Sequence, residues 1–299
     1  MRILLIGAAG QVGRALQPAL ASLGEVIALT RKSVPNRADL CHPAQLAETV
    51  RSLRPGVIIN AAAYTAVDAA ENDEATAMLV NADAPGALAS AAQSIGAQLV
   101  HFSSDYVFDG SGSRAWTEAD APAPLNTYGR SKLAGEQAIA AQCERHLILR
   151  TSWVCSPHGH NFIRTMLRLA RERTELRVVS DQWGVPTAAS LIALVTAQAI
   201  AAGDTLPAGI YHLAPRGETN WHQLAEFVIS HARRLAPDGG WRVTAITPVS
   251  SDDYPTAAVR PRNSRLDTTK LTSALGLELP PWQQDVEQTV AAILAEDHR

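Results

Sequence analysis

Cysteine is nearly absent from the sequence, which has three in 299 residues. Cys41, Cys143 and Cys155 are odd in number and far apart, and none has the CxxC spacing of a zinc or redox site. A chain of this length buries enough apolar surface to fold without disulfides. The scarcity of cysteine excludes a disulfide-stapled scaffold and fits a reducing compartment.

A charge excess and long apolar runs are also missing. The 26 basic and 29 acidic side chains give a net charge of −3, with no block of one sign, which argues against nucleic acid or an anionic membrane as partner. No stretch approaches the ~18 apolar residues of a transmembrane helix. Gly7 interrupts the apolar start Ile3–Ile6, so we interpret that start as a strand and not a signal peptide. We expect a cytoplasmic protein.

The sequence does contain a regular alternation of short apolar runs and segments of helical spacing. For example, Leu46, Val50 and Leu53 lie on one helical face. Continuous apolar strands that alternate with helices form parallel sheets covered on both faces. We therefore predict an α/β fold with a Rossmann-type, doubly wound parallel sheet. The strands expected in the first half are Ile3–Ile6, Val26–Leu29, Val57–Ile59, Leu99–Phe102 and Leu147–Leu149.

The composition changes after residue 150. Five of the six tryptophans lie beyond it, whereas residues 1–60 contain no aromatic side chain. Residues 162–174 have helical spacing, and the strand-like runs 176–179 and 210–213 are expected to return to the main sheet. We predict a dinucleotide-binding domain of residues 1–151 plus about 176–222, and a smaller C-terminal α/β substrate lobe of about 152–175 plus 223–299.

A glycine-rich turn, GAAGQVG at residues 7–13, follows the first expected strand. Gly7 allows the sharp turn, Gly10 lets the backbone approach a pyrophosphate, and Gly13 lets helix and strand pack closely. The helix that begins here offers free N–H groups to phosphates. The GxxGxxG spacing alone also fits a mere turn. Its position between the first strand and a helix predicts a dinucleotide site.

The residues after the second expected strand bear on which dinucleotide is bound. An acidic residue is usual there when the ribose 2′-hydroxyl of NAD is read, but this chain has Thr30-Arg31-Lys32. Because a guanidinium pairs well with the 2′-phosphate of NADPH, we predict a preference for NADPH, with NADH left open. Arg31 as a plain surface charge is the alternative. Asp39 and Leu40 are expected near the adenine.

Tyr128 and Lys132 are four residues apart on a predicted helix and therefore project from one face. A free tyrosine has a pKa of about 10, and a nearby ammonium lowers that pKa, so the pair is suited to acid–base chemistry. A YxxxK spacing by itself is weak, since most such pairs are solvated helix faces. However, the strand at 99–102 leads into Ser103-Ser104-Asp105-Tyr106, at the edge where open α/β sheets bind ligands.

Seven blocks, spread from the first strand to near the C-terminus, resemble the extended type of the short-chain dehydrogenase/reductase superfamily. Within it, the chain is most similar to the family of dTDP-4-dehydrorhamnose reductases. The blocks are GAAGQVG (7–13), NAAAYTAVD (60–68), SSDYVFDG (103–110), PLNTYGRSKLAGE (124–136), RTSWV (150–154), DQWGVPT (181–187) and RPRNSRL (260–266).

The resemblance implies NADPH-dependent reduction of dTDP-4-dehydro-β-L-rhamnose to dTDP-β-L-rhamnose, the last step in making this sugar donor. Ser104, Tyr128 and Lys132 would be catalytic: Tyr128 would protonate the alkoxide formed at C4, while Lys132 would lower the tyrosine pKa and hold the nicotinamide ribose. The expected cofactor contacts are Gly7, Gly10, Gln11, Val12, Gly13, Arg31, Asp39, Leu40, Ala62, Ala63, Tyr64, Thr65, Phe102, Tyr128 and Lys132. The expected substrate contacts are Val67, Ser104, Asp105, Tyr106, Tyr128, Trp153, Gln182 and Arg262.

A metal site is not expected. Some members of this family form a dimer around magnesium held by glutamates, but the matching positions here are Ala15 and Ser190, with Ala292 near the third, and these are poor ligands for a hard cation. A homodimer is left open. His158-Gly159-His160 is interpreted as a solvated turn, because a closed metal site needs three or four ligands.

Two alternative functions remain. A nucleotide-sugar epimerase or dehydratase of the same superfamily needs a second acid–base pair near the sugar, and Asp105-Tyr106 stands where dehydratases tend to place Asp-Glu. A regulatory subunit of the methionine adenosyltransferase type resembles this family and acts as a binding partner. An intact Ser104, Tyr128 and Lys132 argues for chemistry.

Overall fold

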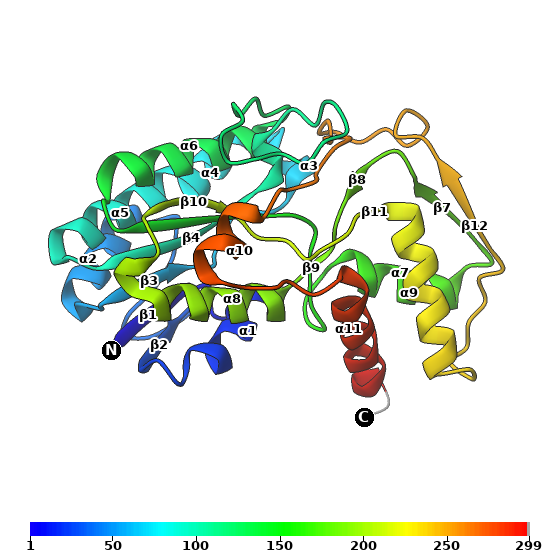
Figure 1. Ribbon diagram of the computed structural model, residues 1–299, viewed down its shortest axis with the longest axis horizontal. Helices are drawn as coiled ribbons and strands as arrows, with labels where there is room; N and C mark the ends of the chain where they lie inside the picture. Colours follow the sequence, from blue (N-terminus) through cyan, green and yellow to red (C-terminus); the bar gives the residue numbers. More distant parts are fainter. Residues whose placement is uncertain (298–299) are drawn as a thin grey trace.

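A computed structural model describes residues 1–297 and places a six-stranded parallel sheet at the centre of the larger part of the molecule (Figure 1). The strands stand in the order β10-β5-β4-β3-β1-β2. Their bounds are β1 (Arg2–Ile6), β2 (Glu25–Leu29), β3 (Val57–Asn60), β4 (Gln98–Ser104), β5 (His146–Thr151) and β10 (Gly209–His212). The α/β class, the strands predicted before residue 150 and the return of residues near 210 to the sheet are confirmed.

The strand order reverses at β1, since β2 pairs with one edge of β1 and β3 with the other. Chains leaving β1 and β3 therefore diverge to opposite sides of the sheet. Such a reversal opens a crevice at the carboxyl ends of the strands, which is where open α/β sheets bind their ligands. The topology thus places the glycine-rich turn after β1 beside the segment that follows β3.

Alternate residues of the strands face two helical layers. Ile3 and Leu5 belong to the core shared with α1 (Gln11–Leu20) and α8 (Ala189–Ala202). Leu4 and Ile6 belong to the core shared with α2 (Pro43–Leu53), α5 (Ala84–Ile95) and α6 (Thr127–Gln142). Because burying each such side chain stabilises the fold by about 1.5–3 kcal/mol, the continuous apolar strands fix both layers.

A second group of elements lies at one side of the sheet (Figure 1). It contains α7 (Phe162–Glu172), β7 (Glu175–Val179), α9 (Trp221–Leu235), β12 (Ala245–Val249) and α11 (Trp282–Asp297). The expectation that residues 176–179 return to the main sheet is wrong, because β7 pairs with β12 in a separate two-stranded sheet. Glu175 and Arg177 alternate with buried residues along β7, and a strand with one solvated face does not fit a sheet covered on both faces. The lobe boundaries stay a prediction.

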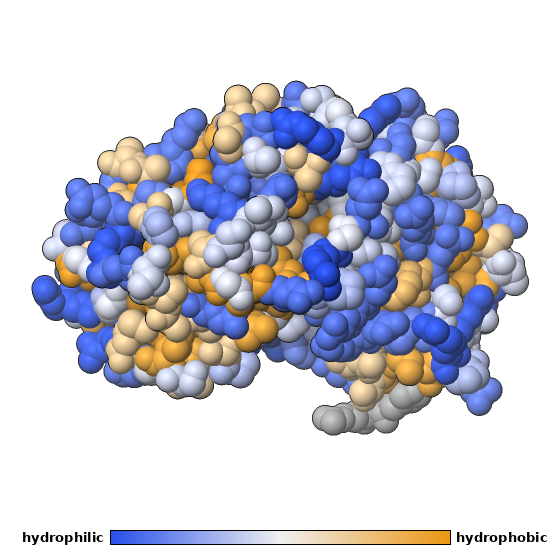
Figure 2. All heavy atoms as spheres, in the orientation of Figure 1, coloured by the Kyte–Doolittle hydropathy of each residue, from blue (hydrophilic) through white to orange (hydrophobic). Residues whose placement is uncertain are grey.

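Short elements connect these parts. β6 (Val154–Cys155) pairs with β9 (Thr187–Ala188), and β8 (Trp183–Gly184) pairs with β11 (Thr219–Asn220). The others are α3 (Val67–Ala70), α4 (Glu74–Met78), η1 (Leu79–Asp83), η2 (Asp105–Val107), η3 (Gly203–Thr205) and α10 (Thr269–Leu275). Within residues 1–297, no helix combines the length and hydropathy needed to cross a bilayer. On the face seen in Figure 2, hydrophilic residues predominate and apolar ones form small groups.

Candidate active site

A cleft of about 1760 Å³ opens at the carboxyl ends of β1, β3 and β4. Its walls come from the glycine-rich turn, the segment after β3, the start of α6, and residues of α7, α9 and α11. Pockets for a single small ligand are commonly about 300–1,000 Å³. The cleft therefore has room for a dinucleotide and a second molecule beside it.

The glycine-rich turn packs directly on the chain that leaves β3. Gly7 has φ +83°, and a Cβ there would lie 2.7 Å from the Ala62 nitrogen. A Cβ at Gly13 would lie 2.1 Å from the Gly7 carbonyl oxygen. Gly10 is the N-cap of α1 and gives that helix no side-chain cap, so the N–H groups of its first turn are open to a phosphate. The turn fits the diphosphate of a dinucleotide.

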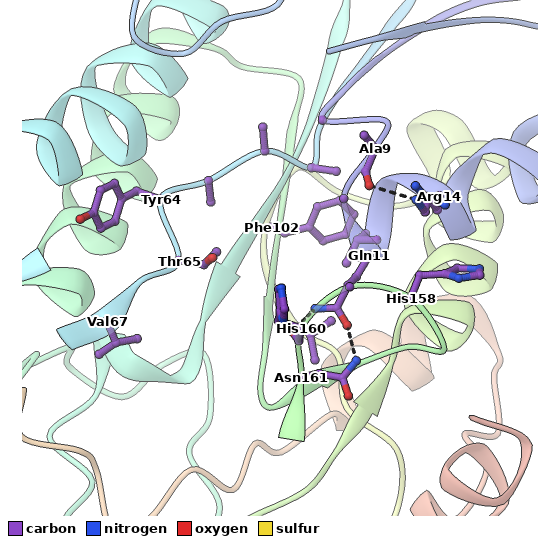
Figure 3. Close-up of a pocket in the computed structure, with 18 of the residues that line it drawn as sticks. Ala9, Gln11, Arg14, Tyr64, Thr65, Val67, Phe102, His158, His160 and Asn161 are labelled. Atoms are coloured by element: carbon purple, nitrogen blue, oxygen red, sulfur yellow. Dashed lines mark hydrogen bonds between the residues drawn. The ribbon is translucent and has the colours of Figure 1, made fainter. Parts of the chain in front are cut away.

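Gln11 joins this turn to a loop far away in sequence (Figure 3). Its Oε1 accepts hydrogen bonds from Ser156 Oγ at 3.1 Å and Asn161 Nδ2 at 2.9 Å, and its Nε2 donates to the His160 carbonyl at 3.4 Å. The loop brings His158 and His160 to the cleft wall, where both are exposed. Their position at the cleft was not predicted, because nothing local in the sequence signals a contact across 145 or more residues.

The cleft wall also contains the residues expected near the adenosine. Arg31, Asp39 and Leu40 all line it, together with Thr30 and Cys41. Arg31 is exposed, so its guanidinium is available to an anionic ligand. Most of the other expected residues also line the cleft: Gly7, Gly10, Gln11, Val12, Ala62, Ala63, Tyr64, Thr65, Val67, Phe102, Ser104, Asp105, Tyr106, Tyr128, Lys132 and Trp153.

Tyr128 is presented to the cleft by the first turn of α6. Asn126 caps this helix, its Oδ1 accepting from the Gly129 nitrogen at 2.8 Å. The Tyr106 ring meets the Tyr128 ring edge to face, with centroids 5.5 Å apart. Desolvation raises the pKa of Tyr128 to about 12, although hydrogen bonding with Ser104 acts in the other direction. Tyr128 is therefore a phenol at neutral pH and can donate a proton.

The carboxyl of Asp105 lies buried next to Ser104. Ser104 Oγ donates to Asp105 Oδ1 at 3.0 Å and accepts from the Tyr106 nitrogen at 3.2 Å. Desolvation raises the pKa of Asp105 to about 6, against hydrogen bonds from Ser264 and Ser104 that favour the carboxylate. A carboxyl that titrates near neutrality inside a cleft is common in functional sites.

Lys132 is a buried side chain at the cleft wall that hydrogen-bonds within the protein. Its Nζ donates to the Phe102 carbonyl at 2.7 Å and lies 3.2 Å from His101 Nε2. Burial lowers the pKa of Lys132 to about 8, and Lys132 is not a cause of the shift in Tyr128. Desolvation is the largest cause of the raised Tyr128 pKa in this structure, and the lowering of that pKa by Lys132 stays a prediction.

Trp153 also forms part of the cleft wall. It has φ +46°, unusual for a residue with a side chain, and its ring stacks on Trp221 with centroids 3.7 Å apart. Gly184 makes room for that ring, because a Cβ there would lie 2.9 Å from Trp153 Cε2. Trp221 also lines the cleft and was not among the predicted residues.

Three expected residues do not line the cleft. Gly13 lies beneath the glycine-rich turn, as its expected packing role requires. Gln182 stands behind the tryptophan stack, its Oε1 accepting from Trp221 Nε1 at 3.1 Å. Arg262 pairs with Asp252 at 2.9 Å. Contact of Gln182 and Arg262 with a substrate stays a prediction.

A metal site was not expected, and that too stays a prediction. Among residues 1–297, no group of three or more His, Cys, Asp or Glu side chains is placed to hold an ion.

Comparisons with known proteins agree with this geometry. A family model described as the RmlD substrate binding domain matches residues 1–295. The dTDP-4-dehydrorhamnose reductase of Shigella flexneri is 49% identical over 290 residues, covering 96% of each chain. A crystal structure of a dTDP-4-dehydrorhamnose reductase from Clostridium acetobutylicum aligns with a TM-score of 0.90 at 32% identity, over 98% of this chain and 100% of that one. The Bacillus anthracis enzyme in complex with NADP aligns with a TM-score of 0.88 at 34% identity, over 97% and 98%.

Proposed function

The chain belongs to the RmlD substrate binding domain family, and from this premise we propose how its cleft reduces dTDP-4-dehydro-β-L-rhamnose to dTDP-β-L-rhamnose. It is an NAD(P)-dependent oxidoreductase, similar over its whole length to dTDP-4-dehydrorhamnose reductases. One observation carries the assignment of roles: Ser104, Tyr128 and Lys132 line the same cleft as the glycine-rich turn.

The dinucleotide is held by backbone more than by charge. The uncapped first turn of α1 donates N–H groups to the diphosphate, and Ala62, Ala63, Tyr64 and Thr65 line the cofactor side of the cleft. Arg31 pairs with a 2′-phosphate, which favours NADPH over NADH. When bound, the nicotinamide supplies the hydride.

The protein supplies the proton and the orientation. Tyr128 is protonated at neutral pH, since its pKa is about 12, and it donates its proton to the oxygen at C4 of the sugar. Ser104 hydrogen-bonds the same oxygen and steadies the tyrosine. Trp153 and Val67, which both line the cleft, contact the sugar nucleotide. The thymine base is inferred from the relatives alone.

The alternative functions lack a comparable observation. An epimerase or dehydratase needs a second acid–base pair, whereas the relatives with high identity are reductases. A purely regulatory subunit does not need Ser104 and Tyr128 in contact with a cleft of this size.

A cytoplasmic location and a homodimer complete the proposal. The location is supported by the three free cysteines, of which Cys143 and Cys155 are buried. The homodimer is left open by the resemblance, and the mass of the protein in solution tests it.

The test of the activity is the loss of NADPH absorbance when the protein meets a panel of 4-keto sugar nucleotides. We expect turnover with dTDP-4-dehydrorhamnose and a much smaller kcat/KM with the UDP- and GDP-linked analogues. Stoichiometric NADPH oxidation separates a reductase from an epimerase or dehydratase, which return the hydride to their substrate. No NADPH consumption with any of these compounds would contradict the proposal.

A further inference from the structure

Residues 258–264 form a segment that follows β12 and runs toward α3 (Figure 1). The proposed reaction gives this segment no role. Side chains of α3 and of the N-terminus of α6 nevertheless bind it, from positions 133 to 192 residues earlier in the chain. These contacts determine how the C-terminal part of the chain meets the residues around the cleft.

Asp68, on α3, binds this segment through its carboxylate. The two oxygens accept from Arg260 Nη1 at 2.7 Å and Nη2 at 2.6 Å, and Oδ1 also accepts from the Ala258 nitrogen at 3.0 Å. Hydrogen bonding with Arg260 lowers the pKa of Asp68 to about 2, so both partners are charged at neutral pH. A pair joined by two parallel hydrogen bonds fixes geometry as well as adding energy.

The first turn of α6 binds the same segment. Asn126 caps this helix with its Oδ1 and donates from Nδ2 to the Val259 carbonyl at 2.8 Å. Glu71, directly after α3, accepts from the Thr127 nitrogen at 2.7 Å. The region of α3, residues 258–264 and the start of α6 are therefore joined in pairs, and they form a closed junction at the helix turn that carries the proposed proton donor.

The chain around η2 packs closely on two members of this junction. A Cβ at Gly129 of α6 would lie 2.2 Å from the Tyr106 carbonyl oxygen. A Cβ at Gly110, which has φ +71°, would lie 2.4 Å from Pro261 Cβ. Neither contact leaves space for a further atom. A shift of residues 258–264 or of α6 would therefore be felt by η2.

Two cleft residues of η2 depend on this packing. Asp105 and Tyr106 both line the cleft. Ser264, at the end of the segment, hydrogen-bonds the Asp105 carboxyl. The Tyr106 ring meets the Tyr128 ring edge to face with centroids 5.5 Å apart. The junction thus connects to three groups expected at the sugar.

We propose that Asp68 and Arg260 are positioning residues, which fasten residues 258–264 to α3 and so hold Tyr106 and Tyr128 in place for the sugar nucleotide. The inference rests on the proposed function, in which Tyr128 gives its proton to the bound sugar. Among the described residues 1–297, the cleft lining includes Val67 and Tyr106 but neither Asp68 nor Arg260. The pair therefore acts through its neighbours and not by touching a ligand.

The variants Asp68→Asn and Arg260→Gln each remove one charge of the pair. We expect the Kd for dTDP to rise about tenfold, because small displacements of positioned groups have large effects. The kcat/KM for dTDP-4-dehydrorhamnose should fall by more than this, since Tyr128 shifts as well. The Kd for NADPH should stay within about twofold. Asp204→Asn is the matched control: it breaks the Arg145–Asp204 pair of 2.9 Å, which also joins distant segments but does not line the cleft.

The double variant, Asp68→Asn with Arg260→Gln, tests whether the two residues act as one unit. A pair that acts together is lost only once, so the double variant should be no worse than the weaker of the single variants. Arg260→Lys keeps the charge without the two parallel hydrogen bonds. It should retain more activity than Arg260→Gln, and it provides the same measurements if Asp68→Asn does not fold.

Equal losses of NADPH and dTDP binding would overturn the proposal, because they would show a general effect on folding. Losses that multiply in the double variant would overturn it as well. A natural protein that does not bind dTDP would contradict both this proposal and the proposed function. If dTDP binds and is weakened in Asp68→Asn, but dTDP-4-dehydrorhamnose is not reduced, the proposed function fails and the positioning role stands.

Discussion

Trp153 and Trp221 stack on each other with ring centroids 3.7 Å apart and planes inclined by 19°. Trp153 follows β5 of the central sheet, and Trp221 begins α9 on the far side of the cleft. The contact therefore joins the central sheet to the second group of elements across the cleft that we propose holds the sugar nucleotide. Gln182 holds Trp221 from behind through its indole nitrogen.

We expect Trp221→Ala to weaken binding of the sugar nucleotide and to leave binding of the dinucleotide unchanged. Aromatic pairs contribute about 0.5–1.5 kcal/mol beyond their buried area, so losing the support of Trp153 should raise the KM for the sugar nucleotide up to about tenfold. The KM for NADPH should stay within about twofold. Trp221→Phe keeps a ring in the stack and is the matched control. Equal effects on both substrates would show that the stack serves the fold and not the sugar site.

Substitutions at Gly10 and Gly13 should have different effects, one on cofactor binding and the other on folding stability. A Cβ at Gly13 would meet the Gly7 carbonyl at 2.1 Å, whereas one at Gly10 would be 3.3 Å away from it. Overpacking costs about 1–3 kcal/mol, so we expect Gly13→Ala to lower the denaturation midpoint. Gly10→Ala should keep the midpoint and weaken NADPH binding, because its methyl group enters the diphosphate position. Urea denaturation and NADPH titration of both variants check this, and a stable Gly13→Ala would refute the close packing.

Arg31 should set the preference between the two dinucleotides. Replacing Arg31 by Gln removes the guanidinium that we propose pairs with the 2′-phosphate, and a charge-assisted hydrogen bond contributes about 1.5–3 kcal/mol. We expect the KM for NADPH to rise at least about tenfold while the KM for NADH is unchanged. Lys32→Gln is the control, since Lys32 does not line the cleft. A similar loss with both dinucleotides would mean that Arg31 does not read the phosphate.

Asp105 should make the protein less stable as pH rises. Its pKa is about 6 in the folded state against an ordinary value of 3.8, so the folded protein binds this proton more tightly than the unfolded chain. Stability is then lost between about pH 4 and pH 6, by about 3 kcal/mol if the whole shift counts. Asp105→Asn should be more stable than the natural protein at pH 7 and equal to it near pH 4. Chemical denaturation at both pH values measures the gap, and a gap independent of pH would contradict the buried titration.

Much of this architecture could be predicted because its causes are local in sequence. The apolar runs of β1 to β5 are continuous, and only a sheet covered on both faces buries them. The glycine spacing after β1 likewise predicts a tight turn before a helix. The four-residue spacing of Tyr128 and Lys132 predicts that both project from one face of α6. The sequence of β7 also contained a local signal. Arg177 is a charged residue between apolar ones, which is typical of a strand with one exposed face, and the prediction that residues 176–179 join the main sheet did not take it into account.

The rest depends on contacts that leave no local pattern. Gln11 accepts from residues near 160, and His101 reaches Lys132 from another element. The upward direction of the Tyr128 pKa shift also depends on burial in the assembled cleft, which no spacing in the sequence reveals. A sequence shows which groups are available, but the balance of desolvation and charge is set by packing.

The central claim, that Tyr128 gives the proton during reduction, is tested most directly by Tyr128→Phe. The variant removes the hydroxyl and keeps the ring against Tyr106, so NADPH should bind with nearly the natural Kd. Because general acid catalysis contributes about 10²–10⁴-fold, kcat for NADPH oxidation with dTDP-4-dehydrorhamnose should fall by at least the lower figure. Turnover within a few fold of the natural protein, with the same Kd for NADPH, would contradict the account.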